Sequence, residues 1–568
     1  MSENNLNTLL DLYLLYENEK VQKEFEIRFK PKPGRNFTKN DYDNLYSSLL
    51  SLGFKTQNNE GSYFLRIQNE PVEGKKLGKF TDNTKIRTEI SGISNIQKYC
   101  KSNQITDIDD VEFIYKKYLN DEKSDAKIEP YDNKDFNFRA SFQTEESIKD
   151  EQLIESIKRD WNGLRKTYRY MNRIELVHDT LPLVFHLTIV KSSNKSKKSS
   201  GYAYEYTVQK ARVFENYETY EFEMEYDITK HNNESLNETE KIVKKGIKYF
   251  YSSIQDSNYP ISYKEMDSVL EEYMNVIHND KIPEKHFKNS KLNIYPTDFI
   301  GYSSYTLQMQ NVIKPDDEIE IPNIRDEYTV TEKADGERRL MFISSKGKCY
   351  LIDTNMNIQY TGAKTKKDAL FKSIIDGEFI KYDKDSNLLL LYAAFDVYYI
   401  GNSDKRHYAF VDKKNGKEGR LHLLDKVVKK LELEYETSSS DNIVKISRKM
   451  FYYNNIFEDC KTILDKTKNR LYDYNIDGLI FTPVKNPLPK STTKSVWEYS
   501  FKWKPPEFNT IDFMVTINEG EEVIYQEDSI KRFKQLTLRC GFDPKKHGYI
   551  NPCATLLEGN FKDNKDIE

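Results

Sequence analysis

The chain has 568 residues, and its 87 lysines and arginines are outnumbered by 91 acidic residues, which gives a net charge of −4 at pH 7. This balance excludes a polybasic coat protein but leaves nucleic-acid binding open, because local patches matter more than the total charge. An aromatic share of 13% excludes a disordered chain. At about 100–200 residues per domain, the length predicts about three or four domains.

The spacing of the cysteines and the hydropathy of the chain limit the cellular compartments in which the protein is expected. The five cysteines are widely spaced and form no C-x-x-C pair, which argues against a disulfide framework or a zinc site and favours a reducing compartment. The longest apolar stretch, residues 388–395, is too short to span a bilayer, and the N-terminus lacks a signal-peptide pattern. We therefore expect a cytoplasmic protein that is neither secreted nor bound to a membrane.

The first part of the chain, residues 1–231, is predicted to consist mainly of β-strands. Short runs alternate between apolar and charged side chains, as at residues 24–29, 185–190 and 220–226. Such alternation is typical of strands with one covered face and one polar face.

The remaining chain divides into three further parts, for a predicted α+β multidomain fold. Residues 232–292 contain a capped helix start followed by apolar positions at helical spacing, so two connecting helices are expected. Strands and helices alternate in residues 293–506. The last part, residues 507–568, begins with a strand-like run.

Two strands of the first part carry carboxylates at every second position. Residues i and i+2 of a strand point to one face, and the opposite faces of both strands are apolar. One such strand alone is most simply explained as the solvent face of a sheet edge. Two of them predict a site for Mg²⁺ or Mn²⁺, which prefer hard oxygen ligands. The candidate metal ligands are Glu24, Glu26, Glu221, Glu223 and Glu225.

A cation held in this way can bridge to a polyphosphate, which also requires basic side chains from other strands. Each basic residue alone is most simply a surface residue. As a set on alternating strands, they suit the interior of a phosphate-lined tunnel. The candidates for triphosphate binding are Arg28, Arg66, Arg87, Arg139, Lys166, Arg169 and Arg173.

The two acidic motifs, Glu24-x-Glu26 and Glu221-x-Glu223-x-Glu225, resemble the signature of the triphosphate tunnel metalloenzymes. The resemblance covers about the first 230 residues. It implies an antiparallel eight-stranded β-barrel in which the acidic strands hold the metal and the γ-phosphate of RNA 5′-triphosphate ends is hydrolysed. His186 departs from the family pattern, which often has an acidic residue there, and packing in the tunnel wall is an equal explanation for it.

A lysine motif, Thr331-Glu-Lys-Ala-Asp-Gly-Glu-Arg-Arg339, begins the second half of the strand-rich chain. A lysine attacks phosphorus only as a free amine, which requires neighbouring cations or burial. Gly336 allows a tight turn next to a ligand. For this motif alone, a charged surface hairpin is a plausible alternative, because Asp-Gly favours turns.

Four more motifs follow in order: Asp376-Gly-Glu378, Phe395-Asp396, Asp477-Gly-Leu-Ile-Phe481 and Lys502-Trp-Lys504. Together with the lysine motif they resemble the covalent nucleotidyltransferases, which include mRNA capping enzymes and ATP- or NAD-dependent ligases. The resemblance implies a central nucleotidyltransferase domain with an ATP-grasp-like α/β fold. For Asp396, a structural role in the strand is as good an explanation as a functional one.

The resemblance to nucleotidyltransferases also implies the role of each motif residue. Lys333 is the expected nucleophile, which forms a covalent lysyl–nucleotide intermediate. Glu378 and Asp477 are expected near the divalent metal. The nucleotide, expected to be GTP, is bound at its ribose, base and α-phosphate by Arg338, Glu378, Phe395, Lys502 and Lys504.

The capping branch is favoured over the ligase branch because Asp477 stands where ligases usually have Glu, and because the two halves are complementary. A module that trims the γ-phosphate of RNA yields the diphosphate end that a GMP-transferring module consumes. One chain with both resembles the N-terminal part of the capping enzymes of large cytoplasmic DNA viruses, such as the poxvirus large subunit. This implies a bifunctional RNA 5′-triphosphatase and GTP:RNA guanylyltransferase of the cytoplasm, viral factory or virion.

Two alternatives remain open: an ATP-dependent polynucleotide ligase with an accessory phosphohydrolase domain, and a non-catalytic subunit that binds RNA 5′ ends. Residues 507–568 are expected to form a partial OB-fold, since they are short for a complete one and lack an R-x-D-K-like motif. No glycine-rich motif for S-adenosylmethionine is found. We therefore expect a methyltransferase domain or subunit, and the transcription machinery, as further partners beside RNA 5′ ends and GTP.

Overall fold

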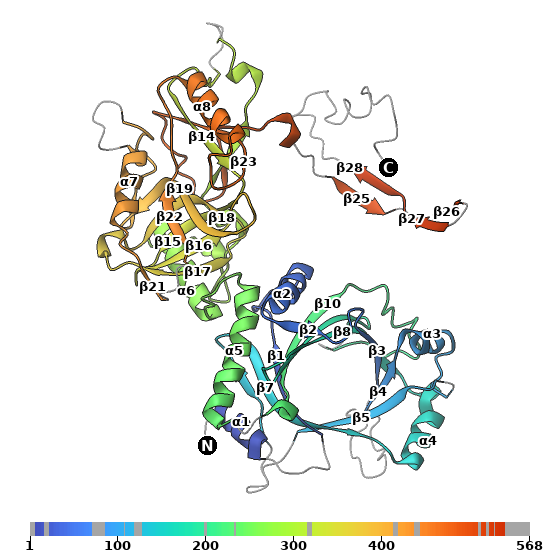
Figure 1. Ribbon diagram of the computed structural model, residues 1–568. Helices are drawn as coiled ribbons and strands as arrows, with labels where there is room; N and C mark the ends of the chain where they lie inside the picture. Colours follow the sequence, from blue (N-terminus) through green and yellow to red (C-terminus); the bar gives the residue numbers. More distant parts are fainter. Residues whose placement is uncertain are drawn as a thin grey trace.

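The computed structural model describes most of the chain (Figure 1). The residues that it describes are 6–15, 22–70, 86–106, 108–118, 128–197, 201–231, 234–314, 321–412, 419–436, 443–508, 513–517, 522–526 and 529–539. None of the described helices combines the length and the apolar character needed to cross a membrane.

The N-terminal part forms a closed antiparallel barrel, seen along its axis in Figure 1. The ring runs β1-β10-β9-β8-β3-β4-β5-β7 and is closed by pairing of β1 with β7. All neighbouring pairs in it are antiparallel, as predicted. The strands are β1 (Gln22–Phe29), β3 (Ser62–Asn69), β4 (Ile86–Ser91), β5 (Val111–Tyr118), β7 (Phe138–Ser147), β8 (Lys166–His178), β9 (Leu183–Ser192) and β10 (Thr219–Tyr226), with β2 (Phe54–Thr56) and β6 (Tyr131–Asn133) at its flanks.

Helices cover the outer face of the barrel on two sides. The apolar faces of β1 and β10, with Phe25, Ile27 and Phe222, are buried in one core with α1 (Leu6–Leu15), α2 (Lys39–Ser51) and α5 (Leu236–Ile254). A separate core joins β3, β4 and β8 to α3 (Ile93–Ser102) and α4 (Glu151–Asp160). Because strand side chains alternate, burying the apolar faces outside turns the charged faces of the same strands into the barrel.

The two helices expected in residues 232–292 are α5 and α6 (Tyr263–Ile277). The predicted capped start is confirmed: the Ser235 hydroxyl accepts from the Glu238 amide, and the Glu238 side chain accepts from the Ser235 amide. Helix α6 packs on the next unit, where the rings of Tyr273 and Phe342 lie 6.1 Å apart. The helix pair thus packs against both the barrel and the central unit. A short pair, β11 (Phe287–Lys288) and β12 (Lys291–Leu292), follows it.

The central unit contains two sheets. A four-stranded sheet has the order β13 (Tyr302–Thr306), β24 (Ser495–Trp503), β23 (Ile476–Pro483) and β14 (Tyr328–Ala334). An eight-stranded sheet is formed by β15 (Glu337–Ile343), β16 (Lys348–Asp353), β17 (Ile358–Lys364), β18 (Ser373–Tyr382), β19 (Leu388–Ile400), β20 (Ser403–Asp404), β21 (Glu434–Tyr435) and β22 (Lys445–Arg448). Helix α7 (Arg420–Lys430) packs on β19 and α8 (Ile456–Lys468) on β14.

The described part of residues 507–568 holds two separate strand pairs. They are β25 (Met514–Ile517) with β28 (Leu536–Arg539), and β26 (Glu522–Gln526) with β27 (Ser529–Phe533). The rest of this part, including residues 540–568, lies outside the described residues. These pairs do not establish the predicted OB-fold, which stays a prediction.

Candidate active sites

One arginine joins the two acidic strands inside the barrel. The Nη2 atom of Arg28 on β1 lies 2.5 Å from Oε1 of Glu223 on β10 and 3.1 Å from Oε1 of Glu26. Its Nε also donates to Glu223 at 2.8 Å. Both carboxylates are buried, and the strands are held in register by pairing of Arg28 with Glu223. The structure therefore brings the predicted carboxylates together around a positive charge.

Two more arginines reach the same acidic strand from β8. Arg169 Nη2 donates to both carboxylate oxygens of Glu221 at 2.7 Å. Arg173 Nη2 lies 3.5 Å from Oε2 of Glu223. Burial alone would raise the pKa of Glu223, but the charges of Arg28 and Arg173 outweigh burial and hold that pKa below its usual range.

His186 on β9 lies between two carboxylates. Its Nε2 is 3.2 Å from Oε1 of Glu175, and its Nδ1 is 3.1 Å from Oε1 of Glu225. Burial by itself favours the neutral imidazole, but the hydrogen bonds of Glu175 and Glu225 raise the pKa of His186 to about 9. The side chain is thus a buried partner of the acidic strand β10.

A group of guanidinium side chains lines the wall next to these carboxylates. Arg66 Nε donates to Glu89 at 2.9 Å, and Arg87 Nη1 lies 3.9 Å from Glu145. The pKa of Arg87 is lowered by burial and also by the neighbouring positive charges of Arg66, Arg28 and Arg169. Crowded cations of this kind form an anion-binding region.

Two of the predicted basic residues have different surroundings. The expectation that Lys166 faces the interior is wrong: its Nζ donates to the carbonyl oxygens of Trp161 at 2.5 Å and Leu164 at 2.6 Å, on the outer side of the barrel. The reason is the two-residue period, which puts Lys166 on the face opposite to Arg169. Arg139, which pairs with Arg28 across β1 and β7, donates to Asp132 at 3.0 Å and 2.6 Å.

The chemistry of the barrel interior fits a divalent cation. Its five glutamates, Glu24, Glu26, Glu221, Glu223 and Glu225, offer only hard carboxylate oxygens. Within the described ranges, no three His, Cys, Asp or Glu side chains are already grouped as a metal site. Arg28 and Arg173 contact Glu223, Arg169 contacts Glu221, and His186 contacts Glu225. A bound cation would replace part of that positive charge.

A second site is a cavity of about 250 Å³ in the central unit. Its lining brings residues of the four-stranded sheet together with residues of the eight-stranded sheet. Five of the predicted nucleotide-site residues line it: Lys333, Arg338, Glu378, Phe395 and Lys502.

The other two predicted residues, Asp477 and Lys504, are joined to Lys333 through the carboxylate of Asp477. It accepts hydrogen bonds from Lys333 Nζ at 2.7 Å and 2.9 Å, and Lys504 Nζ lies 2.7 Å from its Oδ2. The pairing of β14 with β23 shifts register directly after Lys333, which pairs with Gly478. Two ammonium groups around one carboxylate leave an excess of positive charge, which attracts a nucleotide triphosphate.

Two glycines of the motifs, Gly336 and Gly478, lie so close to neighbouring strands that a larger residue would not fit. A Cβ atom at Gly336 would lie 2.8 Å from Cγ of Glu378, and one at Gly478 would lie 1.9 Å from the carbonyl oxygen of Trp503. Any side chain at these positions would push the lysine turn away from β18 or separate β23 from β24. The glycines thus hold the motif residues around the cavity.

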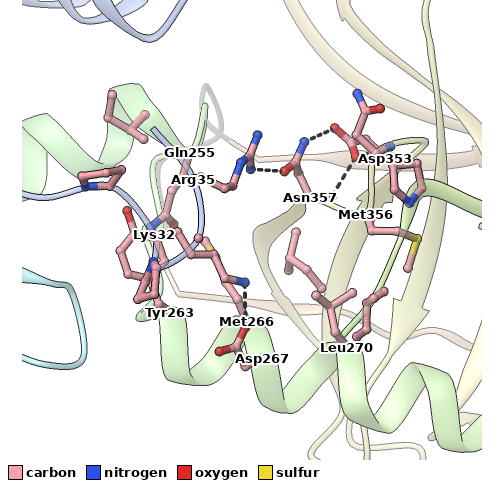
Figure 2. Close-up of a pocket in the computed structure, with 18 of the residues that line it drawn as sticks. Lys32, Arg35, Gln255, Tyr263, Met266, Asp267, Leu270, Asp353, Met356 and Asn357 are labelled. Atoms are coloured by element: carbon pink, nitrogen blue, oxygen red, sulfur yellow. Dashed lines mark hydrogen bonds and ion pairs between the residues drawn. The ribbon is translucent and has the colours of Figure 1, made fainter. Parts of the chain in front are cut away.

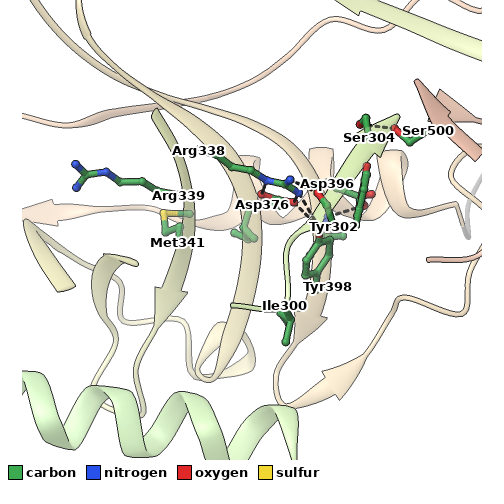
Figure 3. Close-up of polar contacts among 12 residues, drawn as sticks. Ile300, Tyr302, Ser304, Arg338, Arg339, Met341, Asp376, Asp396, Tyr398 and Ser500 are labelled. Atoms are coloured by element: carbon green, nitrogen blue, oxygen red, sulfur yellow. Dashed lines mark hydrogen bonds and ion pairs between the residues drawn. The ribbon is translucent and has the colours of Figure 1, made fainter. Parts of the chain in front are cut away.

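Arg338 is oriented by a buried network that the sequence did not predict. Asp376 accepts from Arg338 Nε at 3.1 Å and from Nη2 at 2.5 Å, and it also accepts from the Tyr398 hydroxyl. The guanidinium lies 5.1 Å from the ring of Tyr302 and 5.5 Å from that of Phe395. Figure 3 shows Arg338, Asp376, Tyr398 and Tyr302 converging. Burial raises the pKa of Glu378, the neighbour of Arg338 across β15 and β18.

Other cavity residues carry no short motif and were missed. Lys449 is buried, lines the cavity and has its Nζ 3.2 Å from Oε1 of Glu332. Phe410 and Phe451 also line it, with ring centroids 4.9 Å apart. Lys449, Phe410 and Phe451 lie far from Lys333 in the sequence, so they reach the cavity only when the chain has folded.

Asp396 also lines the cavity, but its contacts favour the structural explanation. It forms a buried pair with Arg420, whose Nε donates at 2.9 Å and Nη2 at 3.1 Å. Burial raises the pKa of Asp396 against the effect of this arginine. The pair joins the first residue of α7 to β19 at the edge of the cavity.

A larger cavity, of about 760 Å³, lies between the barrel and the central unit (Figure 2). Its walls come from the loop after β1, from α6 and from the turn between β16 and β17. Lys32 is paired with Asp267 at 2.6 Å, and Arg35 Nη1 donates to Asn357 at 2.6 Å. Its lining includes none of the predicted catalytic or nucleotide-binding residues.

Comparison with known proteins places the central cavity in context. Residues 319–506 match the family model "mRNA capping enzyme, catalytic domain". The chain is 25% identical over 326 residues to the probable mRNA-capping enzyme of Acanthamoeba polyphaga mimivirus, a match that covers 49% of this chain and 25% of that protein. The mRNA-capping enzyme of African swine fever virus is 29% identical over 192 residues, which cover 33% of this chain and 18% of that protein. The chain thus spans a quarter or less of these two relatives.

Among solved structures, the mimivirus capping enzyme triphosphatase aligns with 44% of this chain and 99% of its own, at 15% identity and a TM-score of 0.28. The barrel is established by its own strand pairing. The family match covers the five nucleotidyltransferase motifs from Lys333 to Lys504. The resemblance predicted from those motifs is confirmed: the chain resembles viral-type mRNA capping enzymes, and residues 319–506 correspond to their catalytic domain.

Proposed function

We propose that the chain is a bifunctional mRNA 5′-capping enzyme. In the barrel, water attacks the γ-phosphorus of a 5′-triphosphate RNA, which yields a 5′-diphosphate RNA and inorganic phosphate. In the central unit, the Lys333 amine attacks the α-phosphorus of GTP, so that a P–N bond forms and pyrophosphate leaves. The diphosphate end of the RNA then attacks this lysyl-GMP, which forms the GpppRNA cap and restores the amine.

The observation that carries the proposal is the composition of the cavity around Lys333. The Lys333 amine lines one cavity with two further lysines, an arginine and an aromatic ring, namely Lys449, Lys502, Arg338 and Phe395. Lys504 is joined to Lys333 through Asp477. The arginine fits the ribose or phosphates, while Lys502 and Lys504 are placed for the α-phosphate. Phe395, which contacts Arg338, is the candidate surface for the guanine base.

The barrel supports the first step through its paired charges. Arg66, Arg87 and Arg169 form the cationic wall for the triphosphate, and the five glutamates would hold Mg²⁺ or Mn²⁺. In the central unit, Glu378 and Asp477 would hold the cation. In both sites, a bound divalent cation neutralises the negative charge that develops on the phosphate oxygens.

Each step has its own test. Incubation with GTP labelled at the α-phosphate should leave a covalently labelled protein, and Lys333→Ala should remove the label. Glu223→Ala or Arg169→Met should stop phosphate release from 5′-triphosphate RNA while the label persists, because the sites lie in separate units. Loss of both activities in a folded Glu223→Ala protein would contradict the assignment of two sites.

The ligase alternative is distinguished by the same experiment. A polynucleotide ligase would become labelled from ATP rather than GTP. The match of residues 319–506 to the capping catalytic domain favours GTP. A folded protein that accepts no label and releases no phosphate, with either Mg²⁺ or Mn²⁺, would instead favour the non-catalytic RNA-binding alternative.

A further inference from the structure

The connection between β9 and β10 exposes an unusual number of aromatic side chains. Tyr202, Tyr206, Phe214 and Tyr217 are 37%, 49%, 45% and 96% exposed. Large aromatic rings are rarely left together in water unless they meet a ligand or a partner. The small apolar residues of the same connection, Val208, Ala211 and Val213, are buried in the core under it, so the connection also packs through residues other than the exposed rings.

Lysines are interleaved with these rings. Lys195, Lys197 and Lys210 are exposed, and Lys195 forms an isolated β-bridge with Tyr202. Residues 191–218 contain six basic residues against three acidic ones. Two of the acidic residues are paired within the segment, Glu215 with Arg212 at 2.5 Å and Glu218 with Lys191 at 3.8 Å. The surface is therefore positive in a chain whose net charge is negative.

The connection is held firmly on the barrel. The Tyr168 hydroxyl donates to the carbonyl oxygen of Tyr206 at 3.1 Å, and the rings of Tyr170 and Phe214 lie 5.1 Å apart. Asn216 Nδ2 donates to the carbonyl oxygen of Ser192 at 2.8 Å. The exposed rings are thus presented by a supported backbone.

The topology places the start and finish of this connection at one end of the barrel, and its middle packs on the outer side of β8 against Tyr168 and Tyr170. Strand β9 ends at Ser192 and β10 begins at Thr219, at the same end where β1 finishes with Phe29. Ser192 pairs with Arg169 across β8 and β9, and Arg28 is one residue from the end of β1. The arginines of the interior therefore lie next to the end that this connection borders.

We propose that Lys195, Lys197, Tyr202, Tyr206, Lys210, Phe214 and Tyr217 form an aromatic–basic surface that binds the single-stranded RNA behind its 5′-triphosphate. This inference rests on the proposed triphosphatase function of the barrel. Aromatic rings interleaved with lysines are the typical surface for single-stranded nucleic acid, because the bases stack on the rings and the phosphates meet the cations. RNA whose triphosphate enters at this end would cross the surface as it leaves the barrel.

The test compares a long substrate with one that cannot reach the surface. Phosphate release is measured from a 5′-triphosphate RNA of about 20 nucleotides and from inorganic tripolyphosphate. The surface variant is Lys195→Ala/Lys197→Ala/Tyr217→Ala, and a second variant, Lys195→Glu/Lys197→Glu, keeps the aromatic rings. Tyr382→Ala is the control, since this tyrosine is 51% exposed on the central unit.

For both surface variants we expect KM for the RNA to rise by about 10-fold, since one or more base or phosphate contacts are lost. The values for tripolyphosphate should stay unchanged, and the control should match the wild type with both substrates. Unchanged KM for RNA would overturn the proposal and favour a protein partner for the exposed rings. Equal loss with both substrates would also overturn it, because the defect would then lie in the barrel.

A binding measurement separates failure of this inference from failure of the proposed function. If the wild type hydrolyses neither substrate, the triphosphatase assignment fails. Fluorescence anisotropy with a 5′-hydroxyl RNA of about 20 nucleotides then decides the surface alone. Weaker binding by the two surface variants, with a shallower salt dependence, supports the surface, whereas wild-type affinity overturns it.

Discussion

The Nζ atom of Lys333 lies 2.7 Å from Oδ1 of Asp477, although 144 residues separate the two in the chain. The contact arises because β14 and β23 are neighbours and their register shifts at this lysine. Asp477 also binds Lys504, so that one carboxylate positions both the proposed nucleophile and a proposed phosphate ligand. Removing its charge should therefore affect the chemistry more than the fold.

We expect Asp477→Asn to slow lysyl-GMP formation by about 100-fold, because it releases both lysines and weakens the proposed metal site. The measurement is the initial rate of protein labelling from GTP at saturating Mg²⁺ or Mn²⁺. Asp473→Asn is the matched control, since Asp473 is exposed and four residues away. A wild-type rate for Asp477→Asn would show that this carboxylate has no part in positioning Lys333.

The second prediction concerns the arginine that joins Glu26 to Glu223. In the absence of divalent cations, Arg28→Gln leaves these two buried carboxylates without their shared guanidinium, so the barrel should unfold at a lower temperature. Mn²⁺ should restore most of the loss, since a bound cation supplies the missing charge. Thermal melts in chelator and in Mn²⁺ measure both effects.

The control for Arg28 is Arg165→Gln. Arg165 pairs with Glu70 through two hydrogen bonds, at 2.8 Å and 2.6 Å, but on the exposed surface, where ion pairs contribute little. Its melting temperature should stay close to that of the wild type in both conditions. Equal stabilisation of the wild type and Arg28→Gln by Mn²⁺ would mean that the cation does not substitute for the guanidinium.

Much of the fold could be predicted because its signals are local. The alternation around Glu24 and Glu223 identifies strands with one acidic face, and the capping box at Ser235 identifies the start of α5. The five nucleotidyltransferase motifs are short and ordered along the chain. Local patterns of this kind need no knowledge of how distant strands pair.

The rest depends on contacts that no local pattern encodes. Asp376 orients Arg338, yet in the sequence it is only the first residue of a common Asp-Gly-Glu run. Lys449 and Phe451 reach the cavity from a loop after β22. Lys166 is a different kind of error, since its odd spacing from Arg169 already put the two on opposite faces.

The third prediction uses the buried position of Lys166. Burial lowers its pKa from 10.5 to about 8, so between these values the folded protein binds fewer protons than the unfolded chain. Stability due to this group therefore rises with pH across that window and is lost as pH falls through 8. Relative to Lys166→Met, the free energy of unfolding of the wild type should increase between pH 8 and about 10.5.

Denaturant unfolding of the wild type and of Lys166→Met across this pH range measures the difference between their free energies of unfolding. The titration of other groups is the same in both proteins and cancels in this difference. Phosphate release should be unchanged in Lys166→Met, because the side chain lies outside the barrel. A constant difference in stability with pH would mean that Lys166 titrates equally in both states. Loss of phosphate release in a stable Lys166→Met protein would return this lysine to the list of phosphate ligands.

The fourth prediction concerns the contact between the barrel and the central unit. Arg35 Nη1 donates to Asn357, whose own Nδ2 donates to Asp353 at 2.8 Å, and the three residues border the larger cavity. In Arg35→Ala the loop after β1 loses its bond to the turn between β16 and β17. Backbone amides of residues 34–37 and 355–358 should then exchange hydrogen several-fold faster, as measured by mass spectrometry.

Both chemical steps should keep their rates in Arg35→Ala, because neither site contains this residue and α6 still packs on the central unit through Tyr273 and Phe342. Lys39→Ala is the control. It removes an exposed pair with Asp43 on the neighbouring helix α2 and should leave exchange at residues 355–358 unchanged. Unaltered exchange in Arg35→Ala would mean that the packing of α6 alone protects the contact between the barrel and the central unit.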